Sequence, residues 1–246
     1  MHRPLRLTVD RSAIQSNWRW LAEHAGVPAG AAVKADGYGL GARETTEALL
    51  DAGCRDFFVS SWAEAEALAS LVESASLVVL HGVGPDDVEA ASQLSARPCL
   101  NTVEQVGRWE HIAAGRSCDV MIDTGMNRLG LRPTEIAILD GMNIDTLHSH
   151  LACADEDDPL NRMQLERFLA VAGSVPAKRY ALANSAGIGL GRDYSFDLVR
   201  PGISIYGGVQ RPEFEGGIRQ AARIEVQVVQ RRTIPEGESC GYGATF

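Results

Sequence analysis

With 246 residues, 45% of them apolar, and a formal net charge of −9, the chain is long enough for one α/β barrel or two small domains. The negative charge, with no basic stripe, excludes the nucleic-acid-binding classes, and no apolar run approaches the ~20 residues of a membrane span. The N-terminus has no apolar signal-peptide core, and the five scattered cysteines lack CxxC spacing. We therefore expect a soluble cytoplasmic protein without a metal site that binds neither nucleic acid nor membrane.

Short apolar runs predict strands that alternate with helices. A strand at 5–9 and a helix at 13–25, capped by Asp10 or Ser12, come first. Eight further strands are expected at 31–35, 56–60, 77–81, 98–101, 119–123, 145–151, 179–183 and 197–199. Helices are expected at 43–52, 62–71, 85–95, 103–114, 133–139 and 159–172. Because strands that are apolar throughout fit a parallel sheet covered on both faces, the pattern predicts a (β/α)8 TIM barrel, with an open doubly wound sheet as the alternative.

The character of the sequence changes after Gly208. Residues 224–230 alternate between apolar and polar, which predicts an antiparallel strand, and PEGES then predicts a turn. These features are typical of the start of a β-rich C-terminal domain. The tail is shorter than the ~40 residues that an independent core usually needs. We therefore expect either that a partner covers it or that the sequence is a truncated form of a longer protein.

The segment AAVKADGYGLGA at 31–42 combines an apolar run, Lys34 and a glycine-rich turn before a helix. This layout suits a small anionic ligand at the end of a strand. Of the 23 basic residues only Lys34 and Lys178 are lysines. A lysine amine can lose its proton and form a Schiff base with a carbonyl, which a guanidinium group cannot do. Lys34 is therefore a candidate nucleophile, and the alternative is a solvated loop lysine.

The carboxyl ends of barrel strands carry the chemistry in this fold, and polar residues gather there in this chain. They are Lys34 after the first strand, residues 123–128 after the fifth, His150 near the end of the sixth, Asn184 and Ser185 after the seventh, and Arg200, Gly202 and Ile203 after the eighth. Phosphate sites in such barrels often use the loops after the last two strands. The set therefore suggests pyridoxal 5′-phosphate, bound within reach of Lys34.

Each assignment has a structural alternative. His150 could be a buried core histidine, and Arg200 could pair with a carboxylate of the barrel. Tyr242, a further polar candidate in the GYG segment of the tail, could pack in a turn, and Ser185 or Asp123 could cap local structure. Together these alternatives do not explain why nearly every candidate falls at a strand end.

Six motifs resemble, in order and spacing, those of the alanine racemase family of fold-type III pyridoxal-phosphate enzymes: VKADGYGLGA, DTGMNRLG, HSHLACADE, ANSAGI, DLVRPGISIYG and CGYGATF. The resemblance covers the chain nearly end to end. It implies a cofactor-binding TIM barrel at residues 9–214 and a partial β domain at residues 1–8 plus 215–246. It also implies racemisation of L- and D-alanine, supplying D-alanine for peptidoglycan, in a homodimer with shared active sites.

The resemblance further implies residue roles. Lys34 would carry the Schiff base and act as one catalytic base, and Tyr242 would be the second base, offered to the neighbouring subunit. The cofactor-binding set would be Lys34, Tyr38, His150, Asn184, Ser185, Arg200, Gly202 and Ile203. Within it, Tyr38 and Ser185 with the backbone of Gly202 and Ile203 would bind phosphate, Arg200 would face the pyridine nitrogen, and His150 would pack beside the ring. Arg128 would orient the cofactor and substrate.

Two departures from the family pattern bear on substrate range. Many relatives have a carbamylated lysine that steadies the loop arginine, whereas this chain has Met121 there, so Arg128 must find another anion or stand less constrained. The family's β domain also continues beyond GYGATF with further pocket residues. The alternatives are a racemase of another, or a broad range of, small amino acids and a non-catalytic pyridoxal-phosphate-binding module. A decarboxylase of the same fold type fits the motifs less well.

Overall fold

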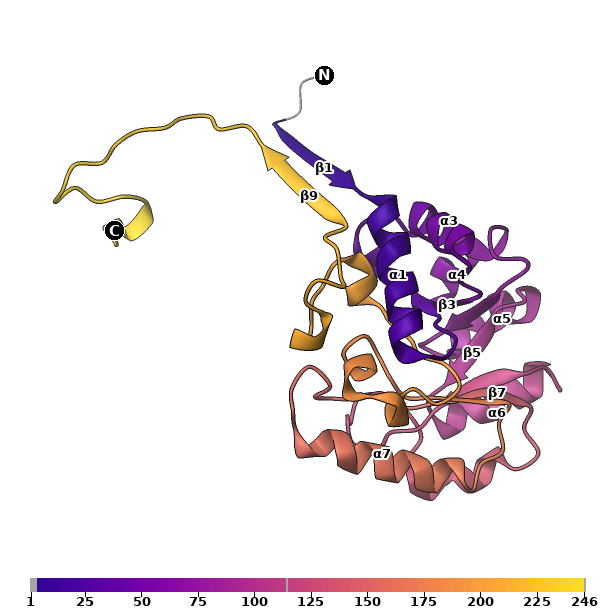
Figure 1. Ribbon diagram of the computed structural model, residues 1–246. Coiled ribbons are helices and arrows are strands. Elements are labelled where there is room, and N and C mark those ends of the chain that lie inside the picture. The colour runs from indigo at the N-terminus through magenta and orange to yellow at the C-terminus, as the bar shows by residue number, and fades with distance from the viewer. Residues whose placement is uncertain (1–3, 114, 246) are drawn as a thin grey trace. The chain divides into compact units, whose positions relative to one another are not determined.

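The computed structural model describes residues 4–113 and 115–245 (Figure 1). Its contacts divide the chain into a larger unit, Val9–Ala222, and a smaller unit made of the described parts of Met1–Thr8 and Arg223–Phe246. The domain boundary expected after residue 214 stays a prediction. No helix among the described residues is long and apolar enough to cross a membrane.

The larger unit is built on a parallel sheet of seven strands, each paired with the next along the chain. The strands are β2 (Ala31–Ala32), β3 (Asp56–Val59), β4 (Ser76–Val79), β5 (Arg97–Leu100), β6 (Cys118–Met121), β7 (Ile144–His148) and β8 (Arg179–Ala181). They fall within the expected apolar runs or one residue outside them.

Residues 197–201 close this sheet into a barrel. On one side the Asp197 N–H donates to Tyr180 O at 3.0 Å, and on the other the Gly30 N–H donates to Val199 O at 2.9 Å. The expected strand at 197–199 is reduced to an isolated parallel bridge between Ala29 and Val199. Pro201 has no N–H to donate, but its O still accepts from the Ala32 N–H at 2.9 Å. The (β/α)8 barrel is therefore confirmed, and the open doubly wound sheet is wrong.

Helices cover the outside of the strands (Figure 1). They are α1 (Arg11–Ala25), α3 (Ala42–Ala52), α4 (Trp62–Ala69), α5 (Val88–Gln93), α6 (Val103–Ala113) and α7 (Pro159–Ala172). The helix expected at 133–139 is instead a 3-10 helix, η2 (Pro133–Leu139), and β8 is followed only by 3-10 turns such as η3 (Ala186–Leu190). After residue 201 comes another 3-10 turn, η5 (Ile203–Tyr206), against which α1 packs.

The position of helix α1 is set by a side-chain cap at its N-terminus and by its buried apolar residues. The Asp10 carboxylate caps its first turn by accepting from the Ala13 N–H at 3.0 Å, and Trp18 and Leu21 are buried, both as expected. Asn17, on the same helix, donates to Ile205 O at 3.0 Å. This contact fixes η5, and with it the polypeptide that follows the last barrel segment.

Two apolar layers and one charged layer fill the barrel and its surroundings. The larger apolar core lies between strands and helices, and a smaller one fills the barrel interior with Ala32, Phe58, Val78, Cys99, Met121, Ala181 and Leu198. Toward the amino ends of the strands, Arg97 pairs with Asp119 and Arg179 pairs with Asp56, both at 2.9 Å. These pairs lie at the amino end of the barrel, opposite the cavity at the carboxyl ends of the strands.

The smaller unit contains a two-stranded sheet of β1 (Leu5–Val9) and β9 (Ala222–Val226). The Gln227 N–H donates to Pro4 O at 3.0 Å beyond the end of β9. The strand expected at 224–230 is wrong in its second half, since β9 ends at Val226 and residues 227–230 form no strand. Residues 227–241 form no further strand or helix.

Candidate active site

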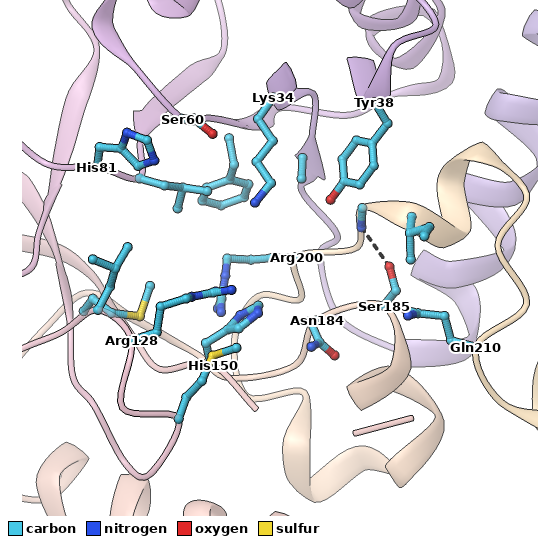
Figure 2. A pocket seen from close by; sticks show the side chains of 18 residues that line it. Lys34, Tyr38, Ser60, His81, Arg128, His150, Asn184, Ser185, Arg200 and Gln210 are labelled. Carbon is cyan, nitrogen blue, oxygen red and sulfur yellow. Dashed lines mark hydrogen bonds between the residues drawn. The ribbon is translucent and has the colours of Figure 1, made fainter. Parts of the chain in front are cut away.

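A cavity of about 480 Å³ opens among the segments that follow the carboxyl ends of the strands (Figure 2). Nine predicted site residues line it: Lys34, Tyr38, Arg128, His150, Asn184, Ser185, Arg200, Gly202 and Ile203. Lys34 and Tyr38 point into it from one side, and Arg128 and His150 do so from the other (Figure 2). Tyr242 belongs to the smaller unit, where its side chain is fully exposed.

The sequence reasoning missed three polar residues of this cavity, Ser60, His81 and Gln210. Ser60 directly follows β3 and His81 lies two residues after β4. The rule that chemistry gathers at the carboxyl ends of barrel strands applies to both and would have found them. Gln210 lies in an irregular segment that no pattern marks.

Lys34 begins a left-handed turn, labelled α2 (Lys34–Tyr38), which the sequence indicated only as glycine-rich. Five consecutive residues have positive φ: Ala35 (52°), Asp36 (52°), Gly37 (61°), Tyr38 (56°) and Gly39 (85°). For the three that are not glycine this conformation costs ~1–2 kcal/mol each, about 3–6 kcal/mol in total. Hydrogen bonds offset part of that cost, including one from the Ala42 N–H to Asp36 Oδ1 at 2.8 Å. Such strain is concentrated at functional sites.

The Lys34 amine is well suited to act as a nucleophile or base. Burial lowers the pKa of Lys34, and the nearby charge of Arg128 lowers it further, while Glu64 opposes both. A lowered pKa increases the share of neutral amine at a given pH, and the neutral amine is the reactive form.

Arg200 is buried, with 7% of its surface exposed, and none of the described carboxylates pairs with it. Its Nη2 donates to Ser149 O, but Nη1 is buried without a partner in the described part of the chain. A buried donor without an acceptor costs ~1–3 kcal/mol. Because Arg200 lines the cavity, Nη1 suits an acceptor atom on a bound ligand. The expected alternative, a pair with a barrel carboxylate, is wrong.

The core histidine of this region is His148 rather than His150. His148, the last residue of β7, is fully buried, and its Nε2 lies 2.8 Å from Asp119 Oδ2. His150 lies two residues further, at the cavity. Burial, together with the charges of Arg200 and Arg128, lowers the pKa of His150 to about 3, so its ring is neutral at pH 7.

Hydroxyl and backbone donors converge at the opposite end of the cavity from Arg128. Ser185 Oγ accepts from the Gly202 N–H at 2.8 Å and from the Ser204 N–H at 3.3 Å. A Cβ on Gly202 would lie 2.2 Å from the Tyr38 hydroxyl oxygen. Gly202 is therefore needed for the tyrosine to lie over it, and a cradle of this kind suits an anion.

Asn184, next to this cradle, caps the 3-10 turn after β8. Its Oδ1 accepts from the Gly187 N–H at 2.9 Å. The alternative reading of Ser185 as a cap is wrong, since its hydroxyl turns instead to Gly202.

Asp123 organises the loop that carries Arg128. Its Oδ1 accepts from the N–H groups of Gly125 and Asn127 at 2.9 and 3.0 Å, which is the capping role considered above. Arg128 makes no hydrogen bond or ion pair within residues 4–113 and 115–245, and Met121 packs inside the barrel. No described residue replaces the missing anion, so the Arg128 charge faces the cavity uncompensated.

Helix α7 supports these loops from outside through one buried side chain. Gln164 Nε2 donates to His150 O at 2.9 Å and to Thr124 Oγ1 at 3.2 Å, and Gln164 Oε1 accepts from the Ala152 N–H at 2.9 Å. The segments after β6 and β7 are therefore tied to one residue of the covering helix.

The described lining of the cavity includes Lys34, Arg128 and Arg200 but no carboxylate. A concave site with one sign of charge raises the local concentration of ligands of the opposite sign. The arrangement can bind an anionic group at Ser185, place an acceptor against Arg200, and present an amine from Lys34.

The family model for the N-terminal domain of alanine racemase matches residues 9–210. The chain is 40% identical, over 254 residues, to the catabolic alanine racemase of Agrobacterium fabrum and 38% identical, over 253, to the alanine racemase of Methylobacterium nodulans. The alignments cover 98% of this chain and 66% and 68% of those proteins. The chain thus spans about two thirds of the length of these relatives.

Solved structures of alanine racemases share the fold of this chain. The crystal structure of alanine racemase from Bartonella henselae with covalently bound pyridoxal phosphate has a TM-score of 0.90 and 33% sequence identity, covering all of this chain and 72% of that one. The biosynthetic alanine racemase of Pseudomonas aeruginosa has the same TM-score at 34% identity, covering 99% and 72%. The family model, the relatives and the shared barrel together place this chain in the alanine racemase family.

Proposed function

We propose that the chain binds pyridoxal 5′-phosphate in this cavity and interconverts L- and D-alanine, supplying D-alanine for peptidoglycan in the cytoplasm. Its relatives include catabolic and biosynthetic alanine racemases, and one structural neighbour holds the cofactor covalently. One observation carries the proposal. The Lys34 amine, with its lowered pKa, and the unpartnered Nη1 of Arg200 belong to one cavity whose described lining contains no carboxylate.

The residues of the cavity fit this cofactor. Lys34 would hold it covalently. The hydroxyls of Tyr38 and Ser185 would bind the phosphate, together with the Ile203 N–H and the Gly202 N–H, which would turn to it from Ser185 Oγ. Arg200 Nη1 would donate to the pyridine nitrogen, which supplies the acceptor that this buried atom lacks. Neutral His150 would pack beside the ring, and Asn184 would hold the adjoining backbone.

Two bases on opposite faces of the substrate would perform the racemisation. The bound cofactor draws electrons from the substrate's Cα and makes its proton acidic. Lys34 Nζ would take or return that proton on one face, and Tyr242 of the partner subunit would do so on the other. Arg128, which has no partner among the described residues, would orient the anionic groups of cofactor and substrate.

The exposure of the second base supports a homodimer as part of this proposal. Tyr242 is fully exposed in the smaller unit, and a tyrosine that serves catalysis must be enclosed with the substrate. Symmetric dimers allow each chain to complete the site of the other.

Exchange of the Cα proton in deuterated water tests the function. The cofactor-loaded chain would receive D- and L-alanine separately, with proton loss followed by NMR and configuration by chiral chromatography. We expect exchange and interconversion of both enantiomers. Lys34→Arg should abolish exchange, whereas Lys178→Arg, the matched change at the other lysine, should not. Absence of exchange from either enantiomer despite bound cofactor would favour a non-catalytic binding module. Faster turnover of serine than alanine would favour a racemase of different range.

Mixing two inactive variants tests the shared site. In a dimer of Lys34→Arg and Tyr242→Phe chains, one of the two sites has both residues intact. Random pairing should restore about a quarter of the wild-type sites. No recovery on mixing would contradict a site that spans two subunits.

A further inference from the structure

Side chains from three covering helices tie the loops of the cavity together in pairs. Glu64 of α4 joins the segments after β2 and β3, Gln105 of α6 joins those after β4 and β5, and Gln164 of α7 joins those after β6 and β7. Glu64 alone of the three is a carboxylate, and it joins the segment that begins with Lys34.

Glu64 divides its two oxygens between two strand ends. Oε2 accepts from the Ser60 N–H at 2.7 Å, and Oε1 accepts from the Ala35 N–H at 2.8 Å. Ser60 lines the cavity, and Ala35 is the first left-handed residue after Lys34. The carboxylate thus holds the turn at the point where the chain leaves the lysine.

A purely local reading of Glu64 explains only one of these bonds. Ser61 and Glu64 form a variant of the capping box: Ser61 Oγ accepts from the Glu64 N–H at 3.4 Å, but Glu64 reaches back to the N–H of Ser60, one residue before the N-cap. Thr102-x-x-Gln105 does the same on α6, where Gln105 Oε1 accepts from the Asn101 N–H at 2.8 Å. An amide therefore serves this capping role. The second bond, to Ala35, needs another acceptor, which a glutamine cannot supply because its second atom is a donor.

We propose that Glu64 is a positioning residue for Lys34: it fixes the left-handed turn that aims the amine into the cavity and supplies the negative charge behind it. The inference rests on the proposed role of Lys34 in catalysis. It assigns to α4, a covering helix, a direct part in setting the orientation and protonation of Lys34.

The negative charge of Glu64 acts on Lys34 among other polar and charged groups. The strand-end segments that line the cavity around Lys34 carry Tyr38, His81, Arg128, His150 and Arg200. Burial and the charge of Arg128 lower the pKa of Lys34, and Glu64 raises it. Removing the Glu64 charge should therefore lower the pKa of Lys34 further.

The variant Glu64→Gln, studied in the full, cofactor-free chain, tests the proposed action of Glu64 on Lys34. Lys34 and Lys178 are the only lysines, so the rate of amine acetylation at each, followed against pH by peptide mass spectrometry, gives Lys34 an internal reference. We expect the Lys34 midpoint to fall by about 0.2–0.7 pH units, the range of a partly exposed charge pair. Exchange of the Ala35 amide hydrogen should accelerate about 10-fold or more, while that of Ser60 changes less. Glu66→Gln, the same change at an exposed site of α4, should alter neither.

An unchanged Lys34 midpoint and unchanged Ala35 exchange in Glu64→Gln would overturn the proposal, as would an equal shift in Glu66→Gln. If Glu64→Gln does not fold, Glu64→Asp keeps the charge but shortens its reach. Ala35 exchange should then accelerate while the Lys34 midpoint stays within about 0.2 units. Unchanged, slow exchange of the Ala35 amide in Glu64→Asp would equally refute the proposed hold of Glu64 on the turn. These readouts need no cofactor, so failure of the wild-type chain to bind pyridoxal phosphate would count against the proposed function and not against Glu64.

Discussion

Replacing Gly202 with alanine places a methyl group where the Tyr38 hydroxyl now lies. The new Cβ would be 2.2 Å from the hydroxyl oxygen and 3.0 Å from Cζ, whereas carbon atoms pack at about 3.5–4.0 Å. The tyrosine must therefore move by about 1 Å. Its ring stacks on Tyr206 at 4.7 Å, but 37% of its surface is exposed, so it can move outward.

This freedom predicts a small loss of stability and a larger loss of ligand affinity. We expect the free energy of unfolding in urea to fall by about 1 kcal/mol, the lower end of overpacking costs. Displacing the hydroxyl from a phosphate removes a hydrogen bond to a charged group, worth about 1.5–3 kcal/mol. Affinity for pyridoxal phosphate, titrated by its visible absorbance, should therefore fall about 10- to 100-fold.

A double-mutant cycle with Tyr38→Phe isolates the cause. Tyr38→Phe alone should weaken binding by a similar factor. Gly202→Ala should add less in that background, because the hydroxyl that clashes most and that binds the phosphate is gone, and only the milder approach to Cζ at 3.0 Å remains. Gly107→Ala adds the same methyl group where no atom lies within 4 Å and should leave binding unchanged. Equal losses from Gly202→Ala in both backgrounds would refute the reasoning.

Three other predictions concern groups around the cavity. The free energy of unfolding should fall as pH drops from about 6.5 toward 4, by up to ~1.4 kcal/mol per pH unit from His148, because burial lowers its folded pKa to about 4 and the unfolded chain takes up the proton first. Urea titrations that stay flat over this range, or an equal slope in His148→Gln, would contradict this. Gln164→Leu should lower the free energy of unfolding in urea by about 2–4 kcal/mol, because it leaves the buried partners of Gln164 unsatisfied. The same change at exposed Gln93 should lower it little. Similar losses for both variants would show that Gln164 does not hold the two loops together. Arg128→Gln should raise the pKa of Lys34, read by the same acetylation ratio to Lys178, and a fall would show that Arg128 does not act on the amine.

Local patterns in the sequence determined most of the barrel. The strands and the longer helices follow from apolar runs and from caps such as Asp10, because periodicity and capping depend on neighbours within a few residues. The ordered motifs also predicted nine site residues that line one cavity. This was possible because parallel strands present their carboxyl ends at the same edge of the sheet.

Tertiary structure decided which partner each polar group finds. His148 and His150 are two residues apart in one motif, yet Asp119 from β6 makes the first a core histidine and the cavity receives the second. Closure of the barrel by residues 197–201 likewise depends on strands far away in sequence.

The turn that carries Lys34 shows the same division. The sequence indicated a glycine-rich turn, but its left-handed course includes Ala35, Asp36 and Tyr38, residues that do not favour it alone. Contacts from elsewhere, such as the Glu64 carboxylate, stabilise that course. Local propensity therefore determined where the elements lie, and long-range hydrogen bonds and burial determined how the site residues are held, because both depend on groups brought close only by folding.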